Sequence, residues 1–199
     1  ADGVPVDPDA AVAYQQNPAH DGSVTDPGFV APFRRAWTRT FEGKVGYPLV
    51  AAGRVFVAIA PTYEFGNKVA ALSIDDGSLL WGPVSIGGSD WSGSIAYDDG
   101  RVFAIDSDGG VTAFDATTGD VIWDTQLTGQ WGFRAPVTAS KGLVLVEGDG
   151  VGGTLYALDQ GTGELSWSVD VMGGGRSAPA VDDTGVYVSY DCHDVVKLD

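Results

Sequence analysis

Short runs in which apolar residues alternate with small or polar ones recur along this chain, and glycine-containing turns separate them. The clearest set surrounds the Asp99-Gly100 pair and covers residues 92–97, 101–106, 110–115 and 120–125. Alternation places apolar side chains on one face of a β-strand, and an Asp-Gly pair between two such runs is a strong hairpin signal. The pattern therefore predicts an all-β protein built from four-stranded antiparallel sheets.

The same unit recurs with a tryptophan at a fixed place in each copy. The segments AALSIDDGSLLW, TAFDATTGDVIW and YALDQGTGELSW end at Trp81, Trp123 and Trp167, and Trp37 precedes them. These four tryptophans are 44, 42 and 44 residues apart. A period of about 43 residues is typical of the four-stranded blades of a β-propeller. We therefore predict a β-propeller in which the four repeat tryptophans have a structural role.

The repeat divides the chain into an arm and a series of blades. Residues 1–32 contain several prolines and lack sustained alternation, so we predict an irregular N-terminal arm there. The predicted propeller region, 33–199, consists of a spare outer strand, three whole blades and a partial fourth blade, at 33–41, 46–84, 92–125, 134–169 and 177–199.

The fourth blade has sequence for three strands only, because Asp199 holds the repeat position that Asp115 and Asp159 hold eight residues before their tryptophans. The strand around Trp37 is a candidate for the missing outer strand, since an N-terminal strand can close a propeller ring and hide two exposed edges. Three arrangements stay open: half of an eight-bladed ring, a ring of two copies, and a closed ring of four blades. An open half would expose apolar surface, so we expect a second polypeptide or a second copy as partner.

Charge and hydropathy disfavour two classes of partner. The 199 residues have a formal net charge of −16 with only 11 lysines and arginines, which disfavours nucleic acid and anionic lipid, although acidic loops can steer a basic partner. No run of about 18 apolar residues is present, so we expect no insertion into a membrane. The polar start suits a mature N-terminus left after removal of a signal peptide, and we expect a secreted, periplasmic or cell-surface protein.

The pattern A-L/F-D-x-x-T-G-x-x-x-W, as in YALDQGTGELSW and AFDATTGDVIW, resembles the repeat of the pyrroloquinoline-quinone-like (PQQ-like) β-propellers. The resemblance covers residues 33–199, and the arm segment AYQQNPAHDGS is similar to one that precedes the first blade in many secreted bacterial members. It implies a ring of seven or eight blades, of which about half is present here. It also implies that the repeat tryptophans dock between neighbouring blades, where the Thr-Gly turn fixes their approach.

The family includes quinoprotein dehydrogenases, so the resemblance also implies a catalytic alternative. Those enzymes hold the quinone against a tryptophan and a disulfide of adjacent cysteines, and they bind Ca²⁺. No Cys-Cys pair exists here, because Cys192 is followed by His193. Asp106 and Asp108 lie in a predicted hairpin and are weak Ca²⁺ candidates, but turn chemistry also explains them. We therefore assign no catalytic residue and no evident cofactor. PQQ and Ca²⁺ belong only to the alternative that this chain is half of a quinoprotein-like enzyme.

Cys192 is the one cysteine of the chain and has no internal disulfide partner. It is either a spare or buried thiol or one half of a disulfide to a second polypeptide, as an unpaired cysteine in a secreted protein often is.

Propellers bind ligands at the mouth of the central channel, in the loops that enter the innermost strands. Counting back three residues from the predicted starts of these strands selects Trp91, Phe133 and Arg176, and Asp90, Trp131 and Arg134 lie around them in the sequence. Two tryptophans outside the repeat register, with two arginines, suit an anionic, sugar-like or peptide ligand. Alternatively, the aromatic residues plug the channel and the arginines neutralise nearby acids. The sequence favours a non-catalytic binding or scaffold module for protein or glycan.

Overall fold

The computed structural model describes residues 10–22, 32–90, 93–150, 152–171, 177–189 and 194–199. Within these residues the regular structure consists of strands β1 to β16, and no helix suited to crossing a membrane occurs there. The strands form four separate antiparallel sheets that follow one another along the chain.

Blade 1 is a five-stranded sheet. Its middle and outer strands form a meander, and the inner edge of β3 pairs with two short strands. The five strands are β1 (Lys44–Val45), β2 (Leu49–Ala51), β3 (Arg54–Ala60), β4 (Asn67–Ser73) and β5 (Leu79–Gly87). The inner edge is split at Pro48, which has no backbone N–H to donate.

The remaining sheets are simple meanders. Blade 2 comprises β6 (Ser94–Asp98), β7 (Arg101–Ile105), β8 (Gly110–Asp115) and β9 (Val121–Gln126). Blade 3 comprises β10 (Thr138–Ser140), β11 (Leu143–Gly148), β12 (Thr154–Asp159) and β13 (Leu165–Asp170). Blade 4 comprises β14 (Ala180–Asp182), β15 (Gly185–Ser189) and β16 (Val195–Leu198). These four sheets confirm the predicted all-β propeller architecture.

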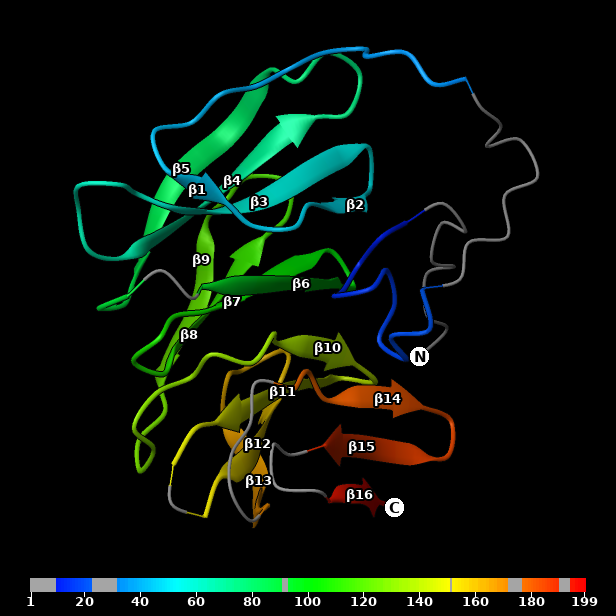
Figure 1. Cartoon of the computed structure of the whole chain (residues 1–199), viewed down its shortest axis with the longest axis vertical. Coiled ribbons are helices and arrows are strands. Elements are labelled where there is room, and N and C mark those ends of the chain that lie inside the picture. The colour runs from blue at the N-terminus through cyan, green and yellow to red at the C-terminus, as the bar shows by residue number, and fades with distance from the viewer. Residues whose placement is uncertain (1–9, 23–31, 91–92, 151, 172–176, 190–193) are drawn as a thin grey trace.

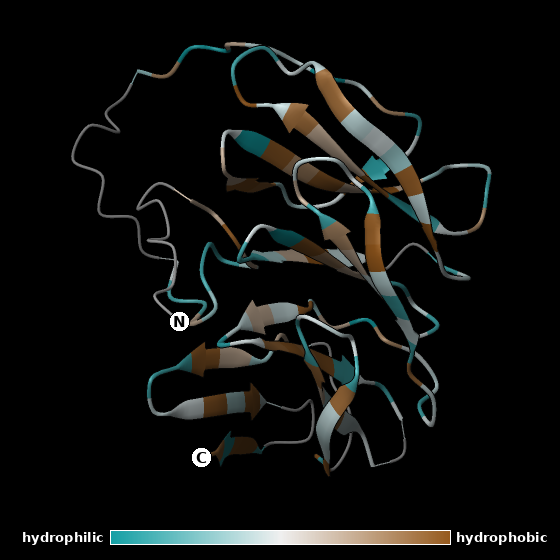
Figure 2. Ribbon diagram, turned by 180° about the vertical axis from the view of Figure 1, so that it is seen from behind, coloured by the Kyte–Doolittle hydropathy of each residue, from teal (hydrophilic) through white to brown (hydrophobic). Residues whose placement is uncertain are grey.

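The blades are arranged as a fan, with blade 1 at the top of Figure 1 and blade 4 at the bottom. Because every blade is a meander, its loops fall at two ends. The N-terminal arm lies at one end, which we call the arm end. The other end, which we call the rim end, carries the residues between β3 and β4, β7 and β8, and β11 and β12, together with the links that enter β6 and β10. Figure 2 shows that apolar residues are concentrated in the strands.

The hydrophobic core lies between the sheets. In β7, Val102 and Ala104 belong to the apolar cluster shared with blade 1, whereas Phe103 and Ile105 belong to the cluster shared with blade 3. Alternate residues of a strand point to opposite faces, so this strand is covered by a neighbouring blade on each side. This arrangement explains why β7 is apolar at consecutive positions from Val102 to Ile105.

Two repeat tryptophans join neighbouring blades. The indole N–H of Trp81 donates to the carbonyl oxygen of Ala116 (3.0 Å), and the indole N–H of Trp123 donates to that of Gln160 (2.9 Å). A glycine lies against each ring, and a Cβ atom at Gly119 would stand 2.6 Å from the Trp81 ring. Each outer strand is therefore fastened to the glycine turn of the next blade.

Residues 33–41, predicted as an outer strand, form no strand in the structure. They run along blade 1, where the Trp37 indole N–H donates to the carbonyl oxygen of Ile74 (2.9 Å) and the ring covers Gly77. The segment thus lies beside blade 1 as β5 lies beside blade 2. The edge for which this segment was a candidate, β16, is at the far side of the fan from it (Figure 1), so the segment does not complete blade 4 in this structure.

The N-terminal arm crosses the innermost strands of the fan. Its backbone bonds to blades 1, 2 and 4 at matching positions: Ala11 N to Val50 O (2.7 Å), Val50 N to Ala11 O (2.8 Å), Tyr97 N to Val12 O (2.7 Å) and Val181 N to Pro18 O (2.7 Å). At blade 3, His20 Nε2 lies 3.4 Å from Thr138 Oγ1. One irregular segment therefore contacts all four blades.

Candidate functional site

The rim end brings together loops from different blades. Asp90, Trp131, Phe133 and Arg134, which the sequence selects as ligand-binding candidates, lie in the links that precede β6 and β10. Asp149, from the β11–β12 hairpin of blade 3, joins them. The meander topology therefore places charged residues of blades 2 and 3 beside one another at this end.

Arg134 links these loops through two ion pairs. Its Nε donates to Asp90 Oδ2 (3.3 Å) and its Nη1 donates to Asp149 Oδ2 (3.1 Å). The hydrogen bond to Asp149, with a further contribution from Asp90, raises the pKa of Arg134 above its ordinary value. The guanidinium group is only partly buried, so it remains within reach of solvent.

Backbone hydrogen bonds fix the loop that carries Arg134. Trp131 N donates to Asp149 O (2.8 Å), and Asp149 N donates to Gly132 O (2.7 Å). Phe133 N donates to Ser107 O of blade 2 (2.9 Å). The loop is thus held by both blades before any partner binds.

The structure separates the two aromatic candidates of this loop. The Trp131 side chain is 79% exposed, whereas Phe133 is fully buried. Phe133 packs against Tyr156 at a ring-centroid distance of 5.9 Å and covers Gly109. Its prediction as a ligand contact is therefore corrected: Phe133 belongs to the core between blades 2 and 3, and Trp131 remains as the accessible aromatic residue.

Asp106 and Asp108 shape a hairpin of blade 2. Asp106 Oδ1 accepts hydrogen bonds from the backbone N–H groups of Asp108 (2.8 Å) and Gly110 (2.9 Å), and burial raises the pKa of Asp106. Asp108 Oδ1 accepts from the hydroxyls of Ser89 (2.6 Å) and Ser107 (3.2 Å). These carboxylates therefore fasten the hairpin to the link that precedes β6.

Two exposed aromatic residues of the rim end were missed by the sequence reasoning. Tyr63 and Phe65, in the β3–β4 hairpin of blade 1, are 97% and 86% exposed. This hairpin is longer than its counterpart in blade 2, and the insertion was the signal that could have selected them. The rim end thus presents aromatic side chains at blade 1 and again at Trp131.

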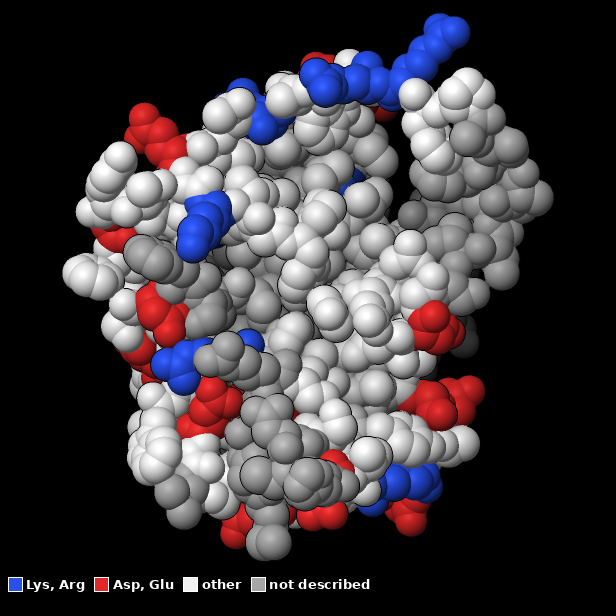
Figure 3. Space-filling view, in the orientation of Figure 1, with Lys and Arg blue, Asp and Glu red and all other residues white. Residues whose placement is uncertain are grey.

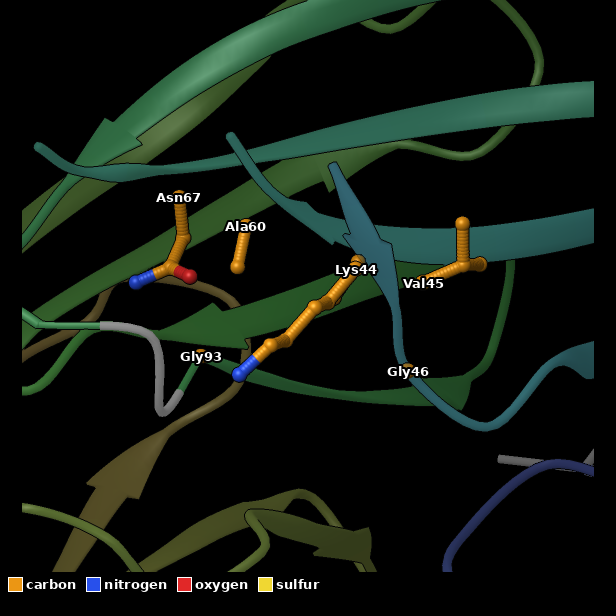
Figure 4. A pocket seen from close by; sticks show the side chains of 7 residues that line it. Lys44, Val45, Gly46, Ala60, Asn67 and Gly93 are labelled. Atoms are coloured by element: carbon orange, nitrogen blue, oxygen red, sulfur yellow. The ribbon is translucent and has the colours of Figure 1, made fainter. Parts of the chain in front are cut away.

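A small pocket lies between blades 1 and 2 (Figure 4). Lys44 extends across it toward Gly93, the Asn67 amide points into it, and Val45 points away. Asn67 Nδ2 donates to Asp90 O (3.0 Å). The cavity volume of about 100 Å³ is well below the roughly 300–1,000 Å³ of ordinary small-molecule sites, so a ligand of the rim end would bind on its surface.

Three candidates, Trp91, Arg176 and Cys192, lie outside the described residues. The structure therefore does not place them relative to Arg134, and the disulfide predicted for Cys192 stays a prediction.

The described residues offer no evident site for the Ca²⁺ that the resemblance implies for dehydrogenases. No group of three or more histidine, cysteine, aspartate or glutamate side chains comes together among them. Asp106 and Asp108 already accept hydrogen bonds within their hairpin. We therefore assign no Ca²⁺ ligand to this part of the chain.

Comparisons with known proteins place the repeat in a family. The family model described as outer membrane protein assembly factor BamB matches residues 34–132 and 126–199. The chain is 28% identical over 191 residues to subunit 1 of a methanol dehydrogenase (cytochrome c) from Methylorubrum extorquens, which covers 80% of this chain and 29% of that protein. It is 34% identical over 102 residues to outer membrane protein assembly factor BamB from Yersinia pestis, which covers 47% of this chain and 25% of that protein.

The solved structures agree on the fold. The quinohemoprotein alcohol dehydrogenase ADHIIG from Pseudomonas putida HK5 matches with a TM-score of 0.71 and 18% identity over 91% of this chain and 34% of that one. The chain thus spans 29% and 34% of the lengths of these two dehydrogenases. Because the family match extends across all four blades, the chain belongs to the family described as outer membrane protein assembly factor BamB, and the predicted resemblance to PQQ-like propellers is confirmed.

Proposed function

We propose that this chain is an extracytoplasmic, non-catalytic propeller module that binds a polypeptide partner through its rim end. Trp131 is the observation that carries the proposal, because its exposed indole stands on a loop held by backbone bonds to Asp149. Tryptophan and arginine are the residues most often found at the energetic centre of protein interfaces. A loop whose backbone is fixed before binding also loses less conformational entropy when the partner arrives.

The charge distribution supports a basic partner. The net charge of −16 creates a negative field that attracts cationic segments over a distance of about one Debye length. Figure 3 shows a row of lysine and arginine side chains at the top of the view, and acidic side chains scattered over the rest of this face among a few basic ones. Asp90 and Asp149 add carboxylates beside Trp131, and Tyr63 and Phe65 extend the aromatic surface.

The family supports the location. Its description names a factor in the assembly of outer membrane proteins, and one relative with that name is 34% identical to this chain. An extracytoplasmic protein of this kind meets polypeptide segments outside the cytoplasm, and a rigid aromatic rim suits such a partner.

Binding to an array of short synthetic peptides with basic, acidic and neutral sequences tests the proposal. We expect basic peptides with aromatic residues to bind best, and Trp131→Ala to weaken them by about 30-fold, as for a hot spot of about 2 kcal/mol. Ile122→Ala, which truncates an exposed residue of the outer strand β9, is the matched control and should leave affinity within about twofold. Equal binding by Trp131→Ala and the original chain would refute the proposal, and selective binding to a glycan array would replace the polypeptide with a sugar.

The similarity to methanol dehydrogenase favours one second candidate, a part of a quinoprotein-like enzyme. The chain covers 29% of that relative, so the cofactor site of such an enzyme would need residues beyond those described here. Equilibrium dialysis of the chain with PQQ, with and without Ca²⁺, tests this candidate. Saturable, Ca²⁺-dependent retention of the quinone would favour it over a pure binding module.

A further inference from the structure

The N-terminal arm covers the backbone edges of the innermost strands at the arm end (Figure 1). The innermost strand of a blade pairs with one neighbour within its sheet, as β6 pairs with β7 and β14 with β15. Val50, Tyr97 and Val181 hold the same position in their blades, because each faces the second residue of the strand that follows. The backbone N–H of each of these three residues donates to a carbonyl oxygen of the arm. A strand edge of this kind can bind any polypeptide segment in an extended conformation.

The arm is held mainly through its backbone. Among its described residues, Val12 and Ala13 bury an apolar side chain and are 7% and 4% exposed. Val12 belongs to the apolar cluster of blades 1 and 2, whereas the side chains of Gln15 and Ala19 are exposed. Because backbone hydrogen bonds do not distinguish side chains, another extended segment with small apolar residues can form the same bonds.

The docked arm also retains unfavourable local features. Gln15, Gln16 and His20 have φ values of 53°, 81° and 55°, in the left-handed region where a Cβ atom crowds the backbone. The Oε1 atom of Gln16 is buried and accepts no hydrogen bond from any residue that the structure describes, which costs free energy. A segment without these features would bind the same edges at a lower cost.

We propose that the inner-strand edges at the arm end form a binding surface for an extended polypeptide segment, and that residues 10–18 occupy this surface as a displaceable, autoinhibitory strap. The incoming segment has two consecutive small apolar residues at the positions of Val12 and Ala13. Its backbone bonds to the inner strands as the strap does at Val50 and Tyr97. The surface lies at the opposite end of the blades from Trp131, so it is separate from the site proposed at the rim end.

A reversible covalent lock tests whether the strap must leave before a partner binds. Ala11 and Val50 face each other in an antiparallel bridge in which both backbone hydrogen bonds are formed. The Cα atoms of such a pair are about 5.5 Å apart, a distance that a disulfide can span. Ala11→Cys and Val50→Cys, made together with Cys192→Ser, therefore give a chain whose strap is fixed when oxidised and free when reduced.

The probe is the labelled, acetylated peptide AAVAYQQNPAHDG, which copies residues 10–22, and its binding is followed by fluorescence polarisation. We expect saturable binding to the reduced chain, binding at least about tenfold weaker to the oxidised chain, and full recovery on reduction. The reason is that a docked strap lowers the apparent affinity in proportion to the fraction of molecules in which it is docked.

One substitution should act in opposite directions in the chain and in the peptide. Val12→Ala in the chain weakens the strap, so it should raise the affinity for the peptide by about fivefold or more. Val12→Ala in the peptide should lower its affinity by a similar factor, because the peptide then loses the same buried contact. Val121→Ala, in the exposed face of β9, is the matched control and should leave the affinity unchanged.

Far-ultraviolet circular dichroism checks that the oxidised and reduced chains have the same fold. Equal binding of the peptide by the two would overturn the proposal, and so would a lack of binding to both the reduced chain and the Val12→Ala chain. Failure of the two introduced cysteines to form a disulfide would contradict the pairing of Ala11 with Val50. Trp131→Ala should leave the affinity for this peptide unchanged, and loss of binding in that variant would assign the peptide to the rim end instead.

Discussion

At Gly119 the backbone and the neighbouring indole both require a residue without a side chain. Its φ is +78°, and a Cβ atom there would lie 2.6 Å from the Trp81 ring. Gly142 has the same φ of +78° but open space around it, so it is the matched control. We expect Gly142→Ala to cost about 1–2 kcal/mol for the left-handed backbone. Gly119→Ala should cost about 2 kcal/mol more, since the indole must also move.

Urea unfolding of the two glycine variants measures this difference as a change in the free energy of unfolding. Equal losses for the two variants would mean that contact with Trp81 adds nothing to the backbone effect, contrary to the role assigned to the docked indole.

We expect His20, which lies 3.4 Å from Thr138 Oγ1, to make the attachment of the arm depend on pH. Burial lowers the pKa of His20 below its ordinary value of 6.5. The contribution of such a histidine to stability is fully present above pH 6.5 and is lost as the pH falls through the lower folded-state pKa. We therefore expect the melting temperature to fall more between about pH 7.5 and about pH 5 for the original chain than for His20→Gln. Parallel pH profiles of the two proteins would show that the buried imidazole is not responsible.

Individual side chains were harder to predict than their repeat positions. The register identified Trp81 and Trp123 because each copy places the indole opposite the same glycine turn. It could not show that Phe133 turns into the core while Trp131 turns outward, since both lie in one irregular link. Tyr63 and Phe65 were not selected because the sequence shows only that the hairpin is longer. It does not show that the two aromatic side chains in the hairpin are exposed.

At the scale of the elements, the arm depends on one buried side chain as well as on its backbone bonds. Val12 lies in the apolar cluster of blades 1 and 2, and its carbonyl accepts a bond from Tyr97. We expect Val12→Ala to lower the free energy of unfolding by about 1–3 kcal/mol, because truncating a buried aliphatic side chain leaves a cavity. Val121→Ala, in the exposed face of β9, should cost about 0.5 kcal/mol or less.

Chemical denaturation of these two valine variants, monitored by far-ultraviolet circular dichroism, gives the comparison. If the arm does not contribute buried contacts, the two substitutions should lower the free energy of unfolding by equally small amounts.

The strands were predictable because turn residues mark where they begin and end, even where the apolar pattern is not a simple alternation. β7 is apolar at four consecutive positions, Val102 to Ile105, because blades cover both of its faces, and the Asp-Gly turn still marks where it begins. The segment 33–41 has the composition of an outer strand, but a strand also needs a neighbour with free backbone groups. The sequence pattern shows a strand-like composition, but it does not show whether a neighbouring strand has free backbone groups. The prediction of a strand at 33–41 failed for this reason.

At the scale of the whole molecule, the fan repeats one contact: an outer-strand indole against the glycine turn of the next blade. The propeller architecture could be predicted from the repeat period of about 43 residues, because four short strands and their turns together have about this length. The period could not reveal whether the four sheets close on themselves, since closure depends on contacts between distant edges.

Hydrogen exchange of the individual indole N–H groups, followed by NMR after assignment by tryptophan substitution, tests this account most directly. We predict slow exchange at Trp81 and Trp123, whose indole N–H groups are buried and hydrogen-bonded, and fast exchange at Trp131, which is 79% exposed. Exchange at Trp81 and Trp123 as fast as at Trp131 would contradict the docking of each blade on the next.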